Sequence, residues 1–227
     1  MQGQDDGLDE TMIKVNEMMR QGLLEFTGLS PEELETRIQR KKTSFKDEWA
    51  FFAPETPTEI AWYYKVSSAY LFANASHETP PEVLEDILPK SVVLDFGGGC
   101  GTSSIALAQK GCSVIYYDIS IIQAEFVKFM AQKHGLDITV MDQGLVIDRS
   151  LDCAVAFDVL EHIPDYPKYL EAISRSLRVG GKVYYYAPFG HSEPSHMDDA
   201  HGLLRVAASL GLKQHPALGI VSCLVKA

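Results

Sequence analysis

The stretch Val92-Val93-Leu94-Asp95-Phe96-Gly97-Gly98-Gly99-Cys100-Gly101 decides the fold. Its first five residues are apolar apart from one acid, as in a short buried strand. Four glycines in five residues follow, and a run favourable to a helix continues through Ala106 to Lys110. Glycine permits tight backbone angles and lets a ligand approach the main chain closely. The stretch therefore predicts a strand, a ligand-binding turn and a helix.

Strand and helix patterns alternate after this turn. Strands are expected at 113–118, 137–141, 152–157, 182–187, 213–218 and 220–226, and helices at 120–134, 166–177 and 198–210. Apolar strands that alternate with helices form a mostly parallel sheet covered on both faces, so the fold class is α/β. Ligands of such sheets bind at the carboxyl ends of the strands.

The front of the chain is helical in pattern, and residues 1–90 are expected to form a helical cap before a sheet domain at 91–227. Apolar residues at helical spacing open it, and Gly28 is the expected stop: Met12, Val15, Met19 and Leu23. Three helix-start signatures follow, each with a hydroxyl residue, proline and glutamate: Ser30-Pro31-Glu32-Glu33, Thr56-Pro57-Thr58-Glu59 and Thr79-Pro80-Pro81-Glu82.

The charge balance argues against nucleic acid as a partner. The net charge is −11 over 227 residues, whereas phosphate binding needs clustered Lys and Arg. One compact basic run occurs just after three glutamates and is expected to be a solvated helix face: Arg37, Arg40, Lys41, Lys42 and Lys46. With no secretory signal, no apolar run of bilayer length and no C-x-x-C pair, we expect a cytoplasmic protein with reduced thiols and no membrane partner. The pattern indicates no oligomeric state.

The glycine spacing discriminates between ligand classes. A dinucleotide fingerprint, G-x-G-x-x-G, would need glycine at Thr102 or Ser104, and a phosphate-binding P-loop would need a lysine after Gly101. Neither condition is met. The pattern present is acid-x-Gly-x-Gly-x-Gly from Asp95 to Gly101.

This pattern resembles the first motif of the class I S-adenosylmethionine-dependent methyltransferases. Four further segments resemble that family in the same order: Tyr116-Tyr117-Asp118, Met141-Asp142-Gln143, Asp158-Val159-Leu160-Glu161-His162-Ile163-Pro164 and Leu177-Arg178-Val179-Gly180-Gly181-Lys182-Val183, the last as a turn before the fifth strand. The resemblance covers 91–227 and implies a Rossmann-like, mostly parallel seven-stranded sheet with helices on both faces. The Glu161-His162-Ile163 stretch is similar to the small-molecule branch that includes quinone-biosynthesis methyltransferases.

The resemblance implies S-adenosylmethionine as cofactor and S-adenosylhomocysteine as product. It assigns Asp95 to the methionyl end, Asp118 to the ribose hydroxyls and Asp142 to the adenine amino group. The remaining expected cofactor residues are Gly97, Gly99 and Gly101 for close backbone approach, with Ile119, Gln143 and Asp158 beside the acids. The expected acceptor is a small, ring-containing organic molecule of biosynthetic or secondary metabolism. A protein or nucleic-acid methyltransferase and a non-catalytic cofactor-binding protein are the alternatives.

Three histidines follow the fourth and fifth expected strands, on the acceptor side: His162, His191 and His196. Histidine titrates near neutral pH, so each is a candidate general base, with a structural role as the open alternative. A metal site could use Asp158, Glu161 and a histidine. Because the neighbours Glu161 and His162 would need a bent backbone to converge on one ion, no metal is predicted.

Eight aromatic residues lie within 49–72: Trp49, Phe51, Phe52, Trp62, Tyr63, Tyr64, Tyr70 and Phe72. Such residues either pack the front region against the sheet or line a pocket for a flat organic ligand. In methyltransferases of this kind the segment before the first strand often caps the active site. A lid that forms the acceptor wall and pure packing are both open interpretations.

Overall fold

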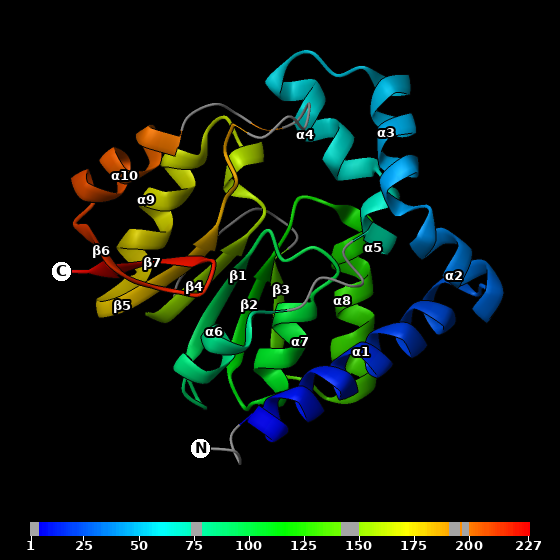
Figure 1. Cartoon of the computed structure of the whole chain (residues 1–227), viewed down its shortest axis with the longest axis horizontal. Helices are drawn as coiled ribbons and strands as arrows, with labels where there is room; N and C mark the ends of the chain where they lie inside the picture. The colour runs from blue at the N-terminus through cyan, green and yellow to red at the C-terminus, as the bar shows by residue number, and fades with distance from the viewer. Residues whose placement is uncertain (1–4, 74–78, 142–149, 191–195, 197–199) are drawn as a thin grey trace.

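The computed structural model describes residues 5–73, 79–141, 150–190, 196 and 200–227. Its centre is a seven-stranded sheet in the order β3-β2-β1-β4-β5-β7-β6 (Figure 1). The strands are β1 Val92–Phe96, β2 Ser113–Tyr117, β3 Ile138–Met141, β4 Leu151–Phe157, β5 Leu177–Tyr186, β6 Leu212–Leu218 and β7 Val221–Lys226. Strands β1 to β5 are parallel to one another, whereas β7 is antiparallel to both β5 and β6. The predicted mostly parallel, seven-stranded α/β fold is confirmed.

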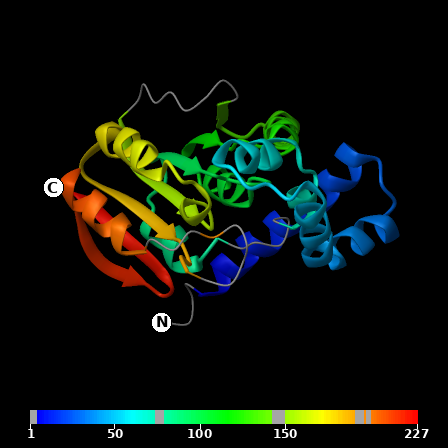
Figure 2. The same ribbon diagram turned by 90° about the horizontal axis from the view of Figure 1, so that it is seen from above.

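Helices cover both faces of this sheet. The helices within the sheet region are α7 Thr102–Gln109, α8 Ile121–His134, α9 Tyr166–Ser176 and α10 Ala200–Ser209. Strand side chains alternate between two cores: Val93 and Val155 pack with α7 and α8, whereas Leu94 and Ala154 pack with α9 and α10. Figure 2 shows α9 and α10 near the C-terminus and the front helices α2 and α3 at the other end of the molecule.

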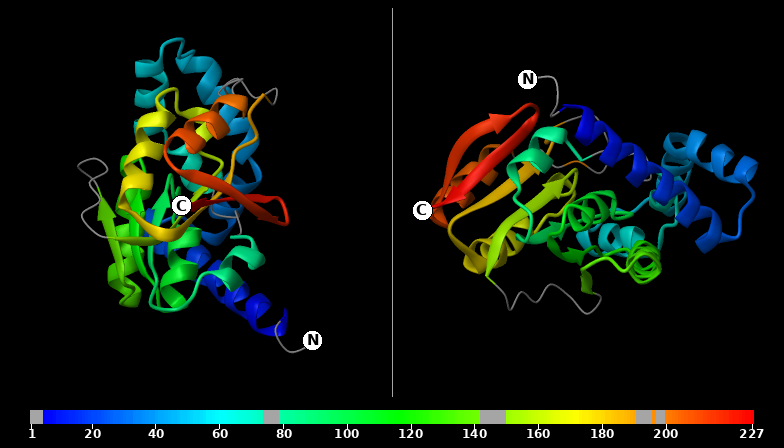
Figure 3. Two further views of the ribbon diagram at one scale, coloured as in Figure 1. Left: turned by 90° about the vertical axis from the view of Figure 1, so that its left-hand side faces the viewer. Right: turned by 90° about the horizontal axis from the view of Figure 1, so that it is seen from below.

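The front region contains six helices in the described residues: α1 Asp5–Thr27, α2 Pro31–Gln39, α3 Lys41–Phe52, α4 Pro57–Val66, α5 Ala69–Ala73 and α6 Pro81–Asp86. The left view of Figure 3 shows α1 beginning at the bottom of the molecule and α3 and α4 at its top. Helix α1 packs against α7 and α8, whereas α3, α4 and α5 lie beyond the carboxyl ends of the strands. No described helix is long and apolar enough to cross a bilayer.

Helix α1 is part of the main core. Its four apolar residues at helical spacing are all buried, as predicted: Met12, Val15, Met19 and Leu23. The helix approaches α8 so closely that a Cβ on Gly22 would lie 2.2 Å from the Met130 sulfur. Helix α1 ends before Gly28, whose φ of +69° is a conformation that glycine adopts without strain. The core is therefore continuous across the front region and the sheet.

Two of the three predicted helix-start signatures are confirmed. The Ser30 and Thr56 hydroxyls accept the backbone N–H groups of Glu33 and Glu59, and both glutamates accept from the cap backbone in return. At the third, the helix start itself is confirmed, since α6 begins at Pro81, but the predicted hydroxyl cap by Thr79 is wrong. Its hydroxyl is buried and donates to Ser103 Oγ at 2.9 Å, so α6 begins without a side-chain cap. A buried hydroxyl needs a partner, and here α7 supplies one that the local sequence does not reveal.

The predicted glycine turn before the fifth strand is also corrected. Strand β5 runs without a break from Leu177 through Gly180 and Gly181, and α9 ends at Ser176. The register against β4 shifts between Leu151 and Cys153, so the glycines lie in an irregular part of one long strand.

The acid of β1 lies beneath the glycine turn. Asp95 is 3% exposed and accepts a hydrogen bond from Ser104 Oγ at 2.6 Å. A Cβ on Gly98 would lie 2.8 Å from Asp95 Oδ2, which shows how closely the turn covers the carboxyl group. Burial raises the pKa of Asp95 to about 6. Its ionised form therefore opposes folding.

An Asp95→Asn variant tests this assignment. The ordinary pKa of 3.8 applies to the unfolded chain and about 6 to the folded one, so wild-type stability falls as pH rises through this window. The free energy of unfolding of the variant minus that of wild type should increase from pH 4 to pH 7, by up to about 3 kcal/mol. Denaturant titrations at three pH values measure the difference. A difference in the free energy of unfolding between variant and wild type that does not change with pH would contradict the raised pKa of Asp95.

Candidate functional site

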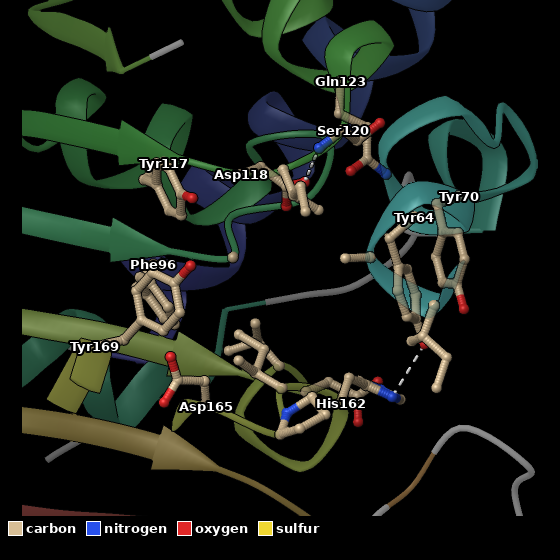
Figure 4. A pocket seen from close by; sticks show the side chains of 18 of the residues that line it. Tyr64, Tyr70, Phe96, Tyr117, Asp118, Ser120, Gln123, His162, Asp165 and Tyr169 are labelled. Atoms are coloured by element: carbon tan, nitrogen blue, oxygen red, sulfur yellow. Dashed lines mark hydrogen bonds between the residues drawn. The ribbon is translucent and has the colours of Figure 1, made fainter. Parts of the chain in front are cut away.

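A cavity of about 280 Å³ lies at the carboxyl ends of β1, β2 and β4 (Figure 4). Helix α4 and Tyr70 of α5 close it on the side away from the sheet. It is lined by Pro57, Ile60, Ala61, Tyr64, Tyr70, Phe96, Gly97, Tyr117, Asp118, Ile119, Ser120, Gln123, Phe157, Asp158, Val159, His162, Ile163, Pro164, Asp165 and Tyr169. The cavity thus occupies the edge of the sheet where ligands of α/β proteins bind.

Gly97 presents bare backbone to the cavity. Its φ is +69°, and an added Cβ would lie 2.2 Å from the Val159 side chain. Gly99 and Gly101 do not line the cavity and act in other ways. Gly99 accepts the Tyr116 hydroxyl at 2.6 Å, whereas Gly101 begins α7 where a Cβ would meet Val127 at 2.5 Å. The glycines therefore combine one close approach to a ligand with tight packing behind it.

Asp118 lines the cavity at the end of β2. Its Oδ2 accepts the backbone N–H of Gly99 at 2.9 Å, and its Oδ1 accepts that of Ser120 at 2.8 Å. Each carboxylate oxygen can accept a further hydrogen bond, so the group stays available to a ligand. Burial raises the pKa of Asp118, although hydrogen bonds from the backbone oppose that shift. Ile119, beside it, offers an exposed apolar surface to the same cavity.

Two polar side chains near Asp118 were not predicted. Ser120 and Gln123 are each 2% exposed, and Ser120 Oγ and Gln123 Nε2 have no hydrogen-bond partner within the described part of the chain. Both residues line the cavity (Figure 4). Buried polar atoms are nearly always hydrogen-bonded, so this end of the cavity suits a ligand with hydroxyl or amine groups. Their position two and five residues after Asp118 could have pointed to them.

Aromatic rings form one wall of the cavity. Phe96 and Tyr117 stack at 5.7 Å, and Tyr169 of α9 lies 5.3 Å from Phe96. The two tyrosines were not predicted as lining residues. Tyr117 directly precedes Asp118 at the end of β2, which is a signal that could have found it. No local signal marks Tyr169, because α9 reaches the cavity only through tertiary packing.

The aromatic cap residues divide between packing and lining. Tyr63 is fully buried, with its ring 5.2 Å from Trp49 and 6.2 Å from Phe45. Of the eight predicted aromatic residues, Tyr64 and Tyr70 line the cavity. Pro57, Ile60, Ala61 and Tyr64 complete the α4 wall at helical spacing, a pattern that could have been read from the sequence.

Four residues with metal-binding side chains converge after β4. Ligand atoms of Asp158, Glu161, His162 and His196 all lie within 4.8 Å of one another. The backbone bends as the sequence argument required, since Asp158 has φ +54° and a 3-10 turn, η2 Leu160–His162, follows. The geometric objection to a shared site is therefore wrong. Glu161 is fully buried, and burial raises its pKa to about 9.

The two histidines of this cluster have defined partners. His162 Nδ1 lies 3.1 Å from the Tyr64 hydroxyl of α4, which is the dashed contact in Figure 4. His196 Nδ1 lies 3.0 Å from the Pro188 carbonyl oxygen, and the two imidazole rings are 4.7 Å apart. The structure thus brings together two of the three predicted histidines, and one of them contacts the cap.

The other predicted site residues are placed as follows. Gly97, Asp118, Ile119, Asp158 and His162 line the cavity. Asp95 lies beneath the glycine turn and accepts a hydrogen bond from Ser104 of α7, and both its ordering of the turn and its contact with a cofactor stay predictions. Asp142, Gln143 and His191 lie outside the described residues.

Comparison with known proteins identifies the family. Residues 69–210, more than half of the chain, match the family model described as a methyltransferase domain. A ubiquinone biosynthesis O-methyltransferase of Idiomarina loihiensis is 30% identical over 101 residues, covering 41% of this chain and 40% of that protein. The chain thus aligns with about two fifths of the length of such curated relatives.

Solved structures share the fold. TehB from Haemophilus influenzae superposes with a TM-score of 0.56 at 17% identity, covering 69% of this chain and 65% of that one. A SAM-dependent methyltransferase from Methanosarcina mazei superposes with a TM-score of 0.52 at 20% identity, covering 66% and 97%. Together with the glycine turn and the acid at the end of β2, the family match leads to one conclusion. The chain belongs to the methyltransferase-domain family, as its resemblance to the class I S-adenosylmethionine-dependent methyltransferases predicted.

Proposed function

We propose that this chain transfers a methyl group from S-adenosylmethionine to a hydroxyl oxygen of a small, ring-containing organic molecule. The observation that carries the proposal is a single cavity that runs from Gly97 and Asp118 to His162. One cavity therefore contains both the residues suited to the methyl donor and the groups that can take a proton from an acceptor. The O-methyltransferase names of the curated relatives support oxygen as the methylated atom.

The residues at the Asp118 end fit the cofactor. The open acceptor capacity of Asp118 suits the two ribose hydroxyls, and the unpartnered Ser120 Oγ and Gln123 Nε2 suit the polar groups beside them. Gly97 provides the bare backbone for the methionyl part, and Ile119 an apolar face for the adenine. Asp142 and Gln143 remain our proposed adenine contacts. When bound, S-adenosylmethionine supplies a methyl group on a positively charged sulfur.

The protein itself mainly has to align the acceptor and keep water away. The α4 wall of Pro57, Ile60 and Ala61 and the tyrosines Tyr64 and Tyr70 suit a flat apolar ring. A hydroxyl that accepts a methyl group must lose its proton. We assign the activation of that hydroxyl to the cluster of Asp158, Glu161, His162 and His196, because the cavity reaches it through Asp158 and His162.

The dimensions of the cavity favour a small acceptor over a macromolecule. A volume of about 280 Å³ is close to the lower end of the roughly 300–1,000 Å³ typical of small-ligand pockets. The basic residues Arg37 and Arg40 line a separate surface groove between α2 and α3. That groove shares no residue with the cavity, so it does not extend the site into a track for nucleic acid.

The first test of this proposal is cofactor binding. Calorimetry should show S-adenosylhomocysteine binding in a one-to-one ratio and no binding of NADH. Asp118→Asn keeps the size of the side chain but removes its charge, so affinity should fall about ten- to a hundredfold. Asp137→Asn is the matched control, because Asp137 bonds Ser113 at the opposite end of the strands. Equal affinity in folded Asp118→Asn and wild type would refute the ribose assignment.

The second test concerns the acceptor. Incubation with S-adenosylmethionine and a panel of phenols and catechols should yield S-adenosylhomocysteine with at least one of them. Single His162→Ala and His196→Ala changes should lower the turnover of that acceptor by about a hundred- to ten-thousandfold, with S-adenosylhomocysteine affinity nearly unchanged. His191→Ala tests the third predicted histidine. His215→Ala on the edge strand β6 is the control. Turnover within a few-fold of wild type in the two cluster variants would contradict their assignment.

A further inference from the structure

We propose that Asp158, Glu161, His162 and His196 bind one divalent first-row transition-metal cation at the acceptor end of the cavity. The binding site stands on the geometry of these four side chains. Its role in activating an acceptor rests on the proposed methyl transfer. The two parts can therefore be tested separately.

The spacing of the ligand atoms is close to that around a single ion. Metal–ligand bonds of about 2.0–2.2 Å to nitrogen and carboxylate oxygen place two ligands of one ion no more than about 4.0–4.4 Å apart. The four groups already lie within 4.8 Å of one another. Small side-chain rotations would close that gap. The left-handed Asp158 and the 3-10 turn after it produce the convergence, because a straight helix or strand would direct Glu161 and His162 apart.

Glu161 supplies an independent indication of a missing ligand. The residue is fully buried, and neither carboxylate oxygen has a hydrogen-bond partner among the residues that the structure describes. A buried carboxylate without a donor is strongly unfavourable unless it is paired or coordinates a metal. Asp158 is a second carboxyl group beside Glu161, and repulsion between the two charged carboxylates adds to that cost. A cation between them would satisfy both acids, and a proton held by Glu161 is the alternative.

The hydrogen bonds of the histidines match those of metal ligands. A carbonyl oxygen can only accept, so the Pro188 carbonyl requires a proton on His196 Nδ1, and in the neutral ring Nε2 is then the unprotonated nitrogen. Metal-binding histidines typically donate their other ring N–H to a carbonyl, carboxylate or water in this way. The Tyr64 hydroxyl lies 3.1 Å from His162 Nδ1 and is able to accept a hydrogen bond from it. Both rings are therefore oriented before any ion arrives.

The ligand set indicates the class of ion. Two imidazoles and two carboxylates suit Mn²⁺, Fe²⁺, Co²⁺ or Zn²⁺, whereas Mg²⁺ and Ca²⁺ prefer sites made of oxygen alone. Since Asp158 and His162 line the cavity, such an ion would face the proposed acceptor. It would lower the pKa of the acceptor hydroxyl as a Lewis acid. The O–H bond would break with its electron pair kept by oxygen, and the proton would pass to solvent.

Direct titration of the full chain with Mn²⁺ tests the site. After treatment with a chelator and its removal, the loss of the free Mn²⁺ signal in electron paramagnetic resonance should show one saturable site, and Zn²⁺ should compete for it. Glu161→Gln and His196→Gln should each weaken binding by more than about tenfold, because each removes a direct ligand. His215→Gln is the matched control, since that histidine also has its Nδ1 near a carbonyl oxygen, of Pro216, but lies outside the cluster.

Circular dichroism and S-adenosylhomocysteine calorimetry on the same samples separate the possible results. His196→Gln guards against a folding defect in Glu161→Gln, because His196 is only partly buried. Absence of saturable Mn²⁺ and Zn²⁺ binding by wild type, or unchanged binding in both cluster variants, would overturn the cation site. S-adenosylhomocysteine binding in that case would leave the proposed function standing. Cation binding without S-adenosylhomocysteine binding would support the site and overturn the methyltransferase proposal.

Discussion

The close approach of the glycine turn to the end of β4 is the constraint on which the site depends. Gly97 has no space for a side chain because Val159 occupies it. The same turn covers the buried carboxyl group of Asp95 and directs the N–H of Gly99 to Asp118. Three parallel strand ends are thereby held in one fixed arrangement. A bulkier residue at position 97 would separate β1 from the β4 loop and remove the bare backbone that the cavity presents.

The cap is coupled to this edge of the sheet through few but specific contacts. Tyr64 of α4 reaches His162, which lies 98 residues later in the chain. Helix α4 in turn packs within the cap through the buried Tyr63. Helix α1 follows a different principle, since its apolar face belongs to the main core. The front region therefore has two physical roles: one part stabilises the sheet, and the other encloses the cavity above it.

The cluster after β4 illustrates how a local cost can indicate function. A left-handed Asp158 and a buried, unpartnered Glu161 are each unfavourable in an ordinary protein core. Asp158 lines the cavity, Glu161 precedes the lining residue His162, and both acids lie beside two oriented histidines. Both features become favourable if a positively charged group is shared there. The same side chains would then bind the ion and define the acceptor end of the site.

Local patterns determined much of this protein from its sequence alone. The order of strands and helices, the glycine turn, Asp118 at the end of β2 and the apolar face of α1 all follow from hydrophobic period and turn chemistry, which act over a few residues. Tertiary structure decided the rest. Thr79 bonds Ser103 instead of capping α6, Tyr169 reaches the cavity from α9, and His196 joins Glu161 from a separate loop. These outcomes depend on contacts between distant segments, and a side chain's partner there is set by packing geometry that no local pattern encodes.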